Sequence, residues 1–220
     1  MAYFAQAQKD FVKELKAHGF EASRIKLLAL LTRLRQIACD PALFLENYEG
    51  GSAKLDLLLE VVTQAVQAGH RMLVFSQFTG MLHHIAARLE ANDIGYCYLD
   101  GSTPTNERLE LVNYFNNSTV PVFLISLKAG GTGLNLTGAD MVIHYDPWWN
   151  PAVEEQAADR AYRLGQEKNV QVIRLITKNT IEEKIFALQE TKKALIDKMI
   201  KPGESFITKL SEEEIRDLFA

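Results

Sequence analysis

The stretch VPVFLISLKAGGTGLNL, residues 120–136, decides the fold class. Its first half is a continuous apolar run with the length of a buried strand, and its glycines follow at the carboxyl end of that strand. A second apolar run, residues 140–145, comes soon after and ends in an aromatic loop. Continuous apolar strands that alternate with helices are typical of a parallel sheet covered on both faces. The stretch therefore predicts an α/β fold.

The same alternation extends outward along most of the chain. We expect helices over about 53–68, 79–92, 104–116, 152–164 and 181–200, and strands over about 71–75, 96–99, 120–126, 140–145 and 169–176. Residues 2–18 and 23–38 have helical spacing, and Ser211 with Glu214 begins a short late helix. We therefore expect a helical segment at 1–51, an α/β lobe at 52–200 and a tail at 201–220.

Composition limits the classes of function. With 24 basic and 28 acidic residues, the net charge is −4, which argues against strong unassisted binding to nucleic acid but not against a local basic patch. No apolar run approaches the roughly 18 residues of a membrane span. Cys39 and Cys97 stand far apart without a CxxC motif, so we expect neither a metal site nor a disulfide framework.

The segment QAADRAYRLGQ, residues 156–166, carries the chemistry that is easiest to interpret. On a helix over 152–164, Gln156, Arg160 and Arg163 would share one face, while Ala157 and Ala161 would pack on the sheet. Two guanidinium groups on one rigid face can bind phosphate oxygens bidentately. The alternative is a solvated face on which neighbouring carboxylates balance the arginines.

Taken together and in order, these segments resemble the second motor lobe of the Swi/Snf-type DNA translocases, a branch of the superfamily-two helicase-like ATPases. The resemblance covers roughly residues 25–200. It is carried by LRQIACDP at 34–41, SAKL at 52–55, VFSQF at 74–78, LDGS at 99–102, the glycine stretch at 126–136, DPWWNP at 146–151 and QAADRAYRLGQ at 156–166. Two departures are Ala38-Cys39-Asp40, where relatives often carry cysteine and histidine, and Trp148 beside the family's usual single tryptophan.

The resemblance implies a RecA-like lobe and assigns roles to its residues. The catalytic residues would be Arg160, Arg163 and Gln156. The nucleotide-binding residues would be Gly131, Gly133, Asn135 and Gln166. The residues along the DNA backbone would be Ser76, Gln77, Lys128 and Trp149, with Trp148 as the other candidate ring.

The sequence contains no G-x-x-x-x-G-K-[ST] phosphate loop and no acidic box that could hold magnesium. In the resembled family those parts belong to a first lobe, which we expect before residue 1. ATP with Mg²⁺ would then be bound mainly by that lobe, and this chain would hold no cofactor tightly. The expected partners are double-stranded DNA and the first lobe, without a membrane, and the fragment itself would be monomeric. The protein would be cytoplasmic and near the nucleoid if bacterial, as the motifs suggest, or nuclear if eukaryotic.

Two other functions remain open at this point. One is a stand-alone dinucleotide-binding domain that uses the glycines at 130–133, although their spacing is not G-x-G-x-x-G and no acidic residue follows the next strand at the usual place. The other is a non-catalytic scaffold with a degenerate motor fold. Against the scaffold, Arg160, Arg163 and Gln166 keep the residue types that the chemistry needs.

Overall fold

The computed structural model describes residues 2–129, 134–162, 169–199 and 210–219. The chain divides into two compact units. The first unit combines Met1–Gly51 with Thr177–Ala220, and the second unit is Ser52–Ile176. We describe each unit by itself.

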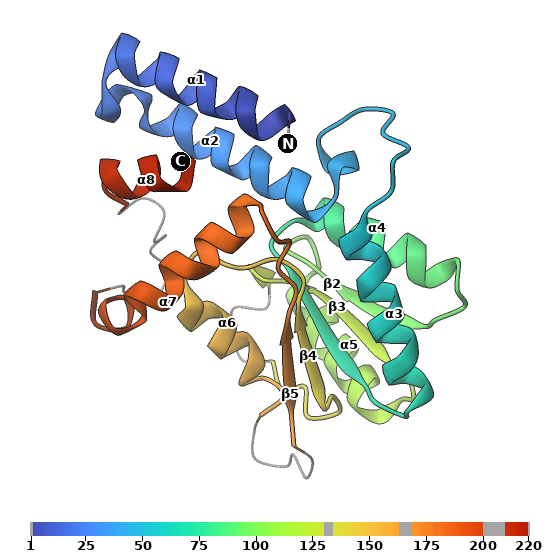
Figure 1. The fold of residues 1–220 in the computed structure, drawn as a ribbon. Helices are drawn as coiled ribbons and strands as arrows, with labels where there is room; N and C mark the ends of the chain where they lie inside the picture. The colour runs from blue at the N-terminus through green and yellow to red at the C-terminus, as the bar shows by residue number, and fades with distance from the viewer. Residues whose placement is uncertain (1, 130–133, 163–168, 200–209, 220) are drawn as a thin grey trace. The chain divides into compact units, whose positions relative to one another are not determined.

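A five-stranded parallel sheet forms the centre of the second unit (Figure 1). Its strands are β1 (Met72–Ser76), β2 (Tyr96–Leu99), β3 (Val122–Ser126), β4 (Met141–His144) and β5 (Gln171–Arg174), in the spatial order β2-β3-β1-β4-β5. The register pairs Ser76 with Ser126 and Phe75 with His144. The carboxyl ends of β1, β3 and β4 therefore meet at one edge of the sheet.

Helices cover both faces of this sheet (Figure 1). The helices α3 (Ala53–Gln67) and α4 (Thr79–Glu90) contact each other on one face. The helices α5 (Thr105–Asn117) and α6 (Pro151–Ala158) pack on the other face, where Val112, Phe115 and Ala157 join strand residues in a buried cluster. Right-handed crossovers require this arrangement, because the connections on the two faces run in opposite directions across the sheet.

The first unit is helical. It contains α1 (Ala2–His18), α2 (Phe20–Cys39), the short 3-10 helix η1 (Pro41–Leu43), α7 (Ile181–Met199) and α8 (Glu212–Phe219). Gly19 separates α1 from α2 with a φ of 74°, a left-handed conformation that glycine adopts without strain. At the start of α8, Ser211 and Glu214 exchange hydrogen bonds as the expected capping box. The ring of Phe219 stacks on Phe11 with centroids 4.5 Å apart, which fixes α8 against α1.

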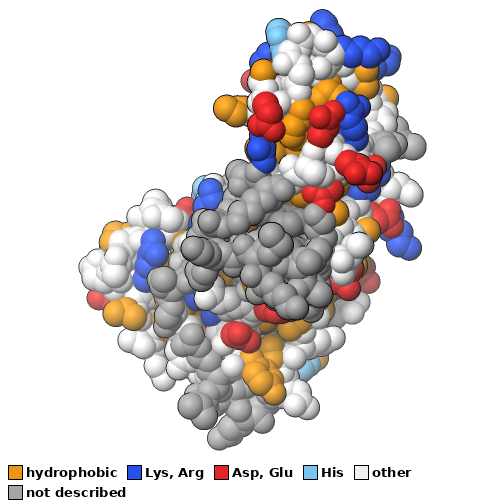
Figure 2. All heavy atoms as spheres, turned by 90° about the vertical axis from the view of Figure 1, so that its left-hand side faces the viewer, with side chains coloured by type: hydrophobic (Ala, Val, Ile, Leu, Met, Phe, Trp, Pro, Cys, Tyr) orange, Lys and Arg blue, Asp and Glu red, His pale blue; other side chains and the backbone are white. Residues whose placement is uncertain are grey.

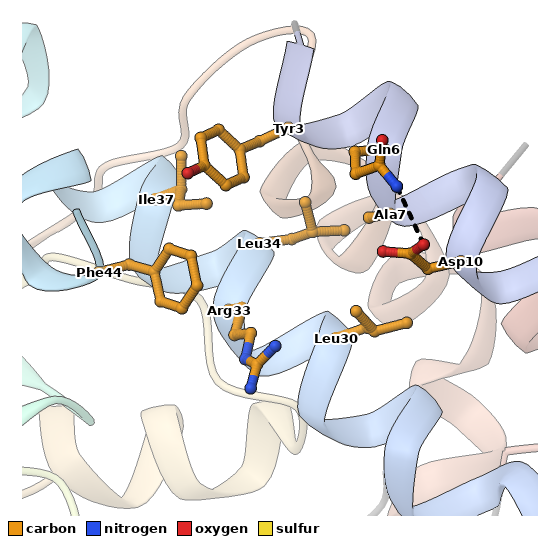
Figure 3. Close-up of a pocket in the computed structure, with 9 residues that line it drawn as sticks. All are labelled: Tyr3, Gln6, Ala7, Asp10, Leu30, Arg33, Leu34, Ile37 and Phe44. Carbon is orange, nitrogen blue, oxygen red and sulfur yellow. Dashed lines mark hydrogen bonds between the residues drawn. The ribbon is translucent and has the colours of Figure 1, made fainter.

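A small pocket of about 100 Å³ lies between α1 and α2 (Figure 3). Tyr3 meets the ring of Phe44 edge-on at 5.9 Å, and the guanidinium of Arg33 lies 5.5 Å from the centre of the same ring. Leu34 lies between these aromatic side chains and α1 (Figure 3). These contacts hold the first helix against the second.

The predicted order of helices and strands is confirmed, with one difference at α6. The helix expected over 152–164 ends at Ala158, and the chain continues through Ala161 in tighter turns. The compact units also group α7 and α8 with α1 and α2, whereas we expected the lobe to extend to residue 200. The division into functional parts at 1–51, 52–200 and 201–220 stays a prediction.

Candidate functional site

The polar residues singled out in the sequence gather where the sheet's strands end. Ser76 ends β1, Ser126 ends β3 and His144 ends β4, and the register brings these three strand ends together. Three loops leave this edge: residues 77–78, residues 127–140 and the tryptophan loop, which we define as residues 145–150. In parallel α/β sheets, ligands bind beyond this edge.

A buried carboxylate links two of these loops. Asp146 is fully buried, and its Oδ1 accepts a 2.5 Å hydrogen bond from the Ser76 hydroxyl. The backbone N–H of Gln77 lies 3.3 Å from both carboxylate oxygens, and that of Phe78 donates to the Ser76 hydroxyl at 3.1 Å. We expected Ser76 to present its hydroxyl to DNA, but Ser76 is buried and its hydroxyl is used inside the protein. Gln77, which is half-buried, is the more accessible of the two.

The glycine stretch and the arginine segment lie next to each other. The backbone N–H of Leu136 donates to the carbonyl of Arg160 at 3.0 Å. The helix has ended before this point, because the N–H of Arg160 donates to Ala157, three residues back. The contact lies near the amino ends of the strands, since Gly138 bonds to Asn116 at the end of α5. Ala157 and Ala161 are buried, as expected.

The early end of α6 changes the predicted geometry of the arginine segment. Gln156 is exposed on the helix, whereas Arg160 lies beyond the helix and is only 3% exposed. We expected both residues on one open helical face, and that prediction was wrong for Arg160. Arg163, Gln166, Gly131 and Gly133 lie outside the described residues.

The expected DNA-facing residues differ in their accessibility. Lys128 is exposed on the loop after β3, and Asn135 is exposed with its carbonyl accepting a 2.8 Å hydrogen bond from the Asn116 side chain. Trp149 is only 5% exposed, while Trp148 is half-buried against the hydrophobic cluster of the second unit. Of the two rings, Trp148 is therefore the one more accessible to a ligand in this structure.

Sequence reasoning missed three residues beneath the tryptophan loop: Glu154, Arg174 and His144. Glu154 is buried, and its carboxylate accepts hydrogen bonds from the backbone N–H of Trp148 and from the side chain of Arg174. Helical spacing held a signal for Glu154, because it lies three and seven residues before Ala157 and Ala161, which we expected to pack on the sheet. No comparable signal marks His144, since a histidine at the end of an apolar strand is ordinary.

His144 is buried in an unusual environment. Its ring stacks on Phe75 with centroids 5.7 Å apart, and its two ring nitrogens find no hydrogen-bond partner among the residues that the structure describes. Burial, with a smaller effect from the positive charge of Arg174, lowers the pKa of His144 to about 4. The imidazole is therefore neutral at physiological pH.

Figure 2 shows the distribution of charged side chains on one face. On the part of the first unit that faces the viewer in Figure 2, basic and acidic side chains are interspersed. The chain as a whole carries a net charge of −4, which provides no overall attraction to an anionic ligand. In the described part of the chain, no helix combines the length and apolar character that a membrane span needs.

The family model of the helicase conserved C-terminal domain matches residues 53–165, which include the whole sheet edge up to the arginine segment. The chain belongs to this family. Over 98% of its length it is 46% identical to YwqA of Bacillus subtilis, which is named as an ATP-dependent helicase/translocase. The chain covers 24% of the length of YwqA. It spans about a quarter or less of the length of the curated relatives that it matches.

Solved structures agree with this assignment. The C-terminal domain of the Sulfolobus solfataricus SWI2/SNF2 ATPase is 33% identical, with a TM-score of 0.77 over 99% of this chain and 90% of that chain. The core of the same ATPase, solved in complex with double-stranded DNA, is 34% identical, with a TM-score of 0.78 over 99% of this chain and 46% of that one. The predicted RecA-like fold and the predicted resemblance to a Swi/Snf-type second lobe are confirmed. The helicase assignment also removes the support for a stand-alone dinucleotide-binding domain.

Proposed function

We propose that this helicase C-terminal domain is the second motor lobe of a double-stranded-DNA-dependent ATPase that moves along duplex DNA. The lobe supplies Arg160 and Arg163 to ATP with Mg²⁺ bound mainly by a first lobe, and it contacts the DNA backbone with its own loops. The observation that carries the proposal is the hydrogen bond from Leu136 to Arg160, because it joins the end of the glycine stretch to the arginine segment.

The chemistry of the arginine segment suits phosphoryl transfer. A guanidinium is always charged, and it stabilises negative charge best in a site that excludes water. Arg160 is 3% exposed and is therefore largely desolvated before any nucleotide arrives. Arginines of this kind contribute roughly three to five powers of ten in rate when they reach the transferring phosphoryl group. Glycines in the glycine stretch would let the backbone approach the nucleotide closely.

DNA contact is assigned to the loops at the carboxyl ends of the strands. Lys128 is exposed and Gln77 is half-buried, so both can reach phosphate oxygens without reading bases. Trp148 offers the more accessible ring of the tryptophan loop, and an aromatic ring there can pack on a sugar or at a groove. The Sulfolobus relative solved with double-stranded DNA supports this choice of ligand. Trp149, our first choice from the sequence, would have to leave its buried position to take the same role.

The test uses the full-length protein that contains this domain. Arg163→Ala should remove most DNA-stimulated ATP hydrolysis while nucleotide binding changes little, because most triphosphate contacts lie in the first lobe. Arg88→Ala is the matched control, since Arg88 is exposed on α4 and paired only with Asp56 among the described residues. If both variants hydrolyse ATP like the unaltered protein, the lobe is a scaffold and not a working part of the motor.

A further inference from the structure

Glu154 joins three elements of the second unit through one carboxylate. It lies in the first turn of α6 and is 1% exposed. Its Oε1 accepts a 2.6 Å hydrogen bond from the backbone N–H of Trp148, in the tryptophan loop. Its Oε2 accepts a 2.8 Å hydrogen bond from Nε of Arg174, the last residue of β5.

Stability alone is a weak reason for this arrangement. A buried carboxylate loses its hydration, and an apolar side chain of similar volume often stabilises a fold as well or better. Once present, the carboxylate needs both donors, because removing either one leaves part of a buried charge unsatisfied. What the pair does provide is a fixed geometry. It holds the Trp148 backbone at a fixed distance from α6, and it holds α6 against β5.

The same helix leads directly to the nucleotide side of the domain. Arg160 lies six residues after Glu154, and its carbonyl is bonded to Leu136 at the end of the glycine stretch. A shift of the arginine segment would therefore move α6, and the carboxylate of Glu154 would move the backbone of Trp148 with it.

We propose that Glu154, held by Arg174, is the positioning residue that couples the arginine segment to Trp148. The proposal rests on the proposed function, in which Trp148 faces DNA and the arginine segment faces ATP. Glu154 itself touches neither ligand. It determines the position of Trp148 when the arginine segment shifts.

The first test asks whether Glu154 positions the loop. The chain contains only two tryptophans, both in the tryptophan loop, so 5-fluorotryptophan labelling gives a ¹⁹F NMR spectrum that reports on this loop alone. A Trp149→Phe variant assigns the two signals. Glu154→Gln should shift or broaden the Trp148 signal, and Arg174→Met should do the same, while Arg174→Lys, which keeps the positive charge, should do so less.

Glu110→Gln serves as the control, because Glu110 is exposed on α5 and its loss removes the same charge. It should leave both signals in place. Circular dichroism shows whether each variant is folded, and Arg174, whose side chain is 40% exposed, gives a second route if Glu154→Gln does not fold. A Trp148 signal that is unchanged in folded Glu154→Gln or Arg174→Met overturns the proposal.

The second test uses the full-length protein and separates this proposal from the proposed function. Glu154→Gln should raise the DNA concentration that half-stimulates ATP hydrolysis by about tenfold, equivalent to about 1.4 kcal/mol. Trp148→Ala should raise it as well. If Trp148→Ala raises this DNA concentration and Glu154→Gln does not, the proposed coupling through Glu154 is wrong, while the proposed DNA contact of Trp148 is supported. If neither variant changes it, the proposed DNA contact of Trp148 is wrong.

Discussion

The backbone N–H of Leu136 donates a 3.0 Å hydrogen bond to the carbonyl of Arg160. This bond joins two segments that lie more than 20 residues apart in the sequence. The chain has already left the helix at this point, since the N–H of Arg160 donates to Ala157, and the carbonyl of Arg160 ties the arginine segment to the end of the glycine stretch. The predictions below follow from this contact, from the loops at the carboxyl ends of the strands and from the buried groups that support them.

Asp146→Asn should destabilise the domain. The carboxylate accepts from the Ser76 hydroxyl and from the backbone N–H of Gln77, and an amide would turn a donor toward one of them. A buried donor or acceptor left without a partner costs about 1–3 kcal/mol. Urea unfolding of the chain measures this loss directly.

Asp93→Asn is the control for that experiment. Asp93 is exposed with a φ of 54°, a conformation that Asn adopts as readily as Asp. Its replacement should leave the free energy of unfolding almost unchanged. Equal stability of the two variants would show that the Ser76–Asp146 contact contributes little.

Acid should destabilise the domain through His144. The pKa of this residue is about 4 in the folded protein and 6.5 without burial, so the unfolded chain binds more protons between these values. The free energy of unfolding should then fall by up to about 3 kcal/mol as the pH drops from 6.5 toward 4, with the full contribution present above 6.5. Urea unfolding at a series of pH values gives the slope.

A His144→Phe variant isolates this effect. The phenyl ring can keep the stacking on Phe75 but cannot take up a proton. The variant should lose less stability than the unaltered chain over the same pH range. Identical slopes for the two proteins would mean that His144 is not the group that titrates.

The 220-residue chain alone should show no DNA-stimulated ATP hydrolysis. Its sequence lacks a phosphate loop and an acidic box, so it has no group to hold the triphosphate and its metal. A coupled ATPase assay with rigorously purified chain tests this. Turnover that stays with the chain through purification would refute the two-lobe account.

Binding of the chain to duplex DNA should be weak, independent of sequence and strongly dependent on salt. The net charge of −4 offers no broad attraction, and a few contacts such as Lys128 carry the interaction. Each neutralised phosphate contributes about −0.9 to the slope of log K against log salt concentration. Anisotropy titrations with unrelated duplexes measure both quantities, and nanomolar binding at physiological salt would not fit this description.

Much of the fold could be predicted from the sequence because its signals are local. The apolar runs at 71–75 and 120–126 have the length and composition of buried strands, and both are strands in the structure. Ser211 with Glu214 marked the start of α8 for the same reason. The end of α6 at Ala158 could not be predicted in this way, because the sequence has no glycine or proline between residues 152 and 164 to mark it.

The sequence predicted which segments form the candidate site, but not how their side chains are arranged in space. Motif order identified the glycine stretch, the tryptophan loop and the arginine segment. The structure joins the first and the third through Leu136 and Arg160, but near the amino ends of the strands, whereas the tryptophan loop lies at their carboxyl ends. The accessibility of the side chains was harder to predict, because it depends on packing between elements. Ser76, Trp149 and Arg160 are all buried, although we expected them to be exposed. The Glu154–Arg174 pair was missed because its partners come from separate elements.

The central claim is that the arginine segment takes part in ATP hydrolysis, and Arg160→Lys in the full-length protein tests it most directly. Lysine keeps the charge and much of the buried volume but loses the planar fork, whereas Arg160→Ala should also lower the melting temperature because Arg160 is buried. The measurement is DNA-stimulated ATP turnover per folded molecule of Arg160→Lys. The account predicts a fall of about three orders of magnitude with little change in nucleotide affinity. A variant that melts at a lower temperature but keeps its full turnover per folded molecule would contradict it.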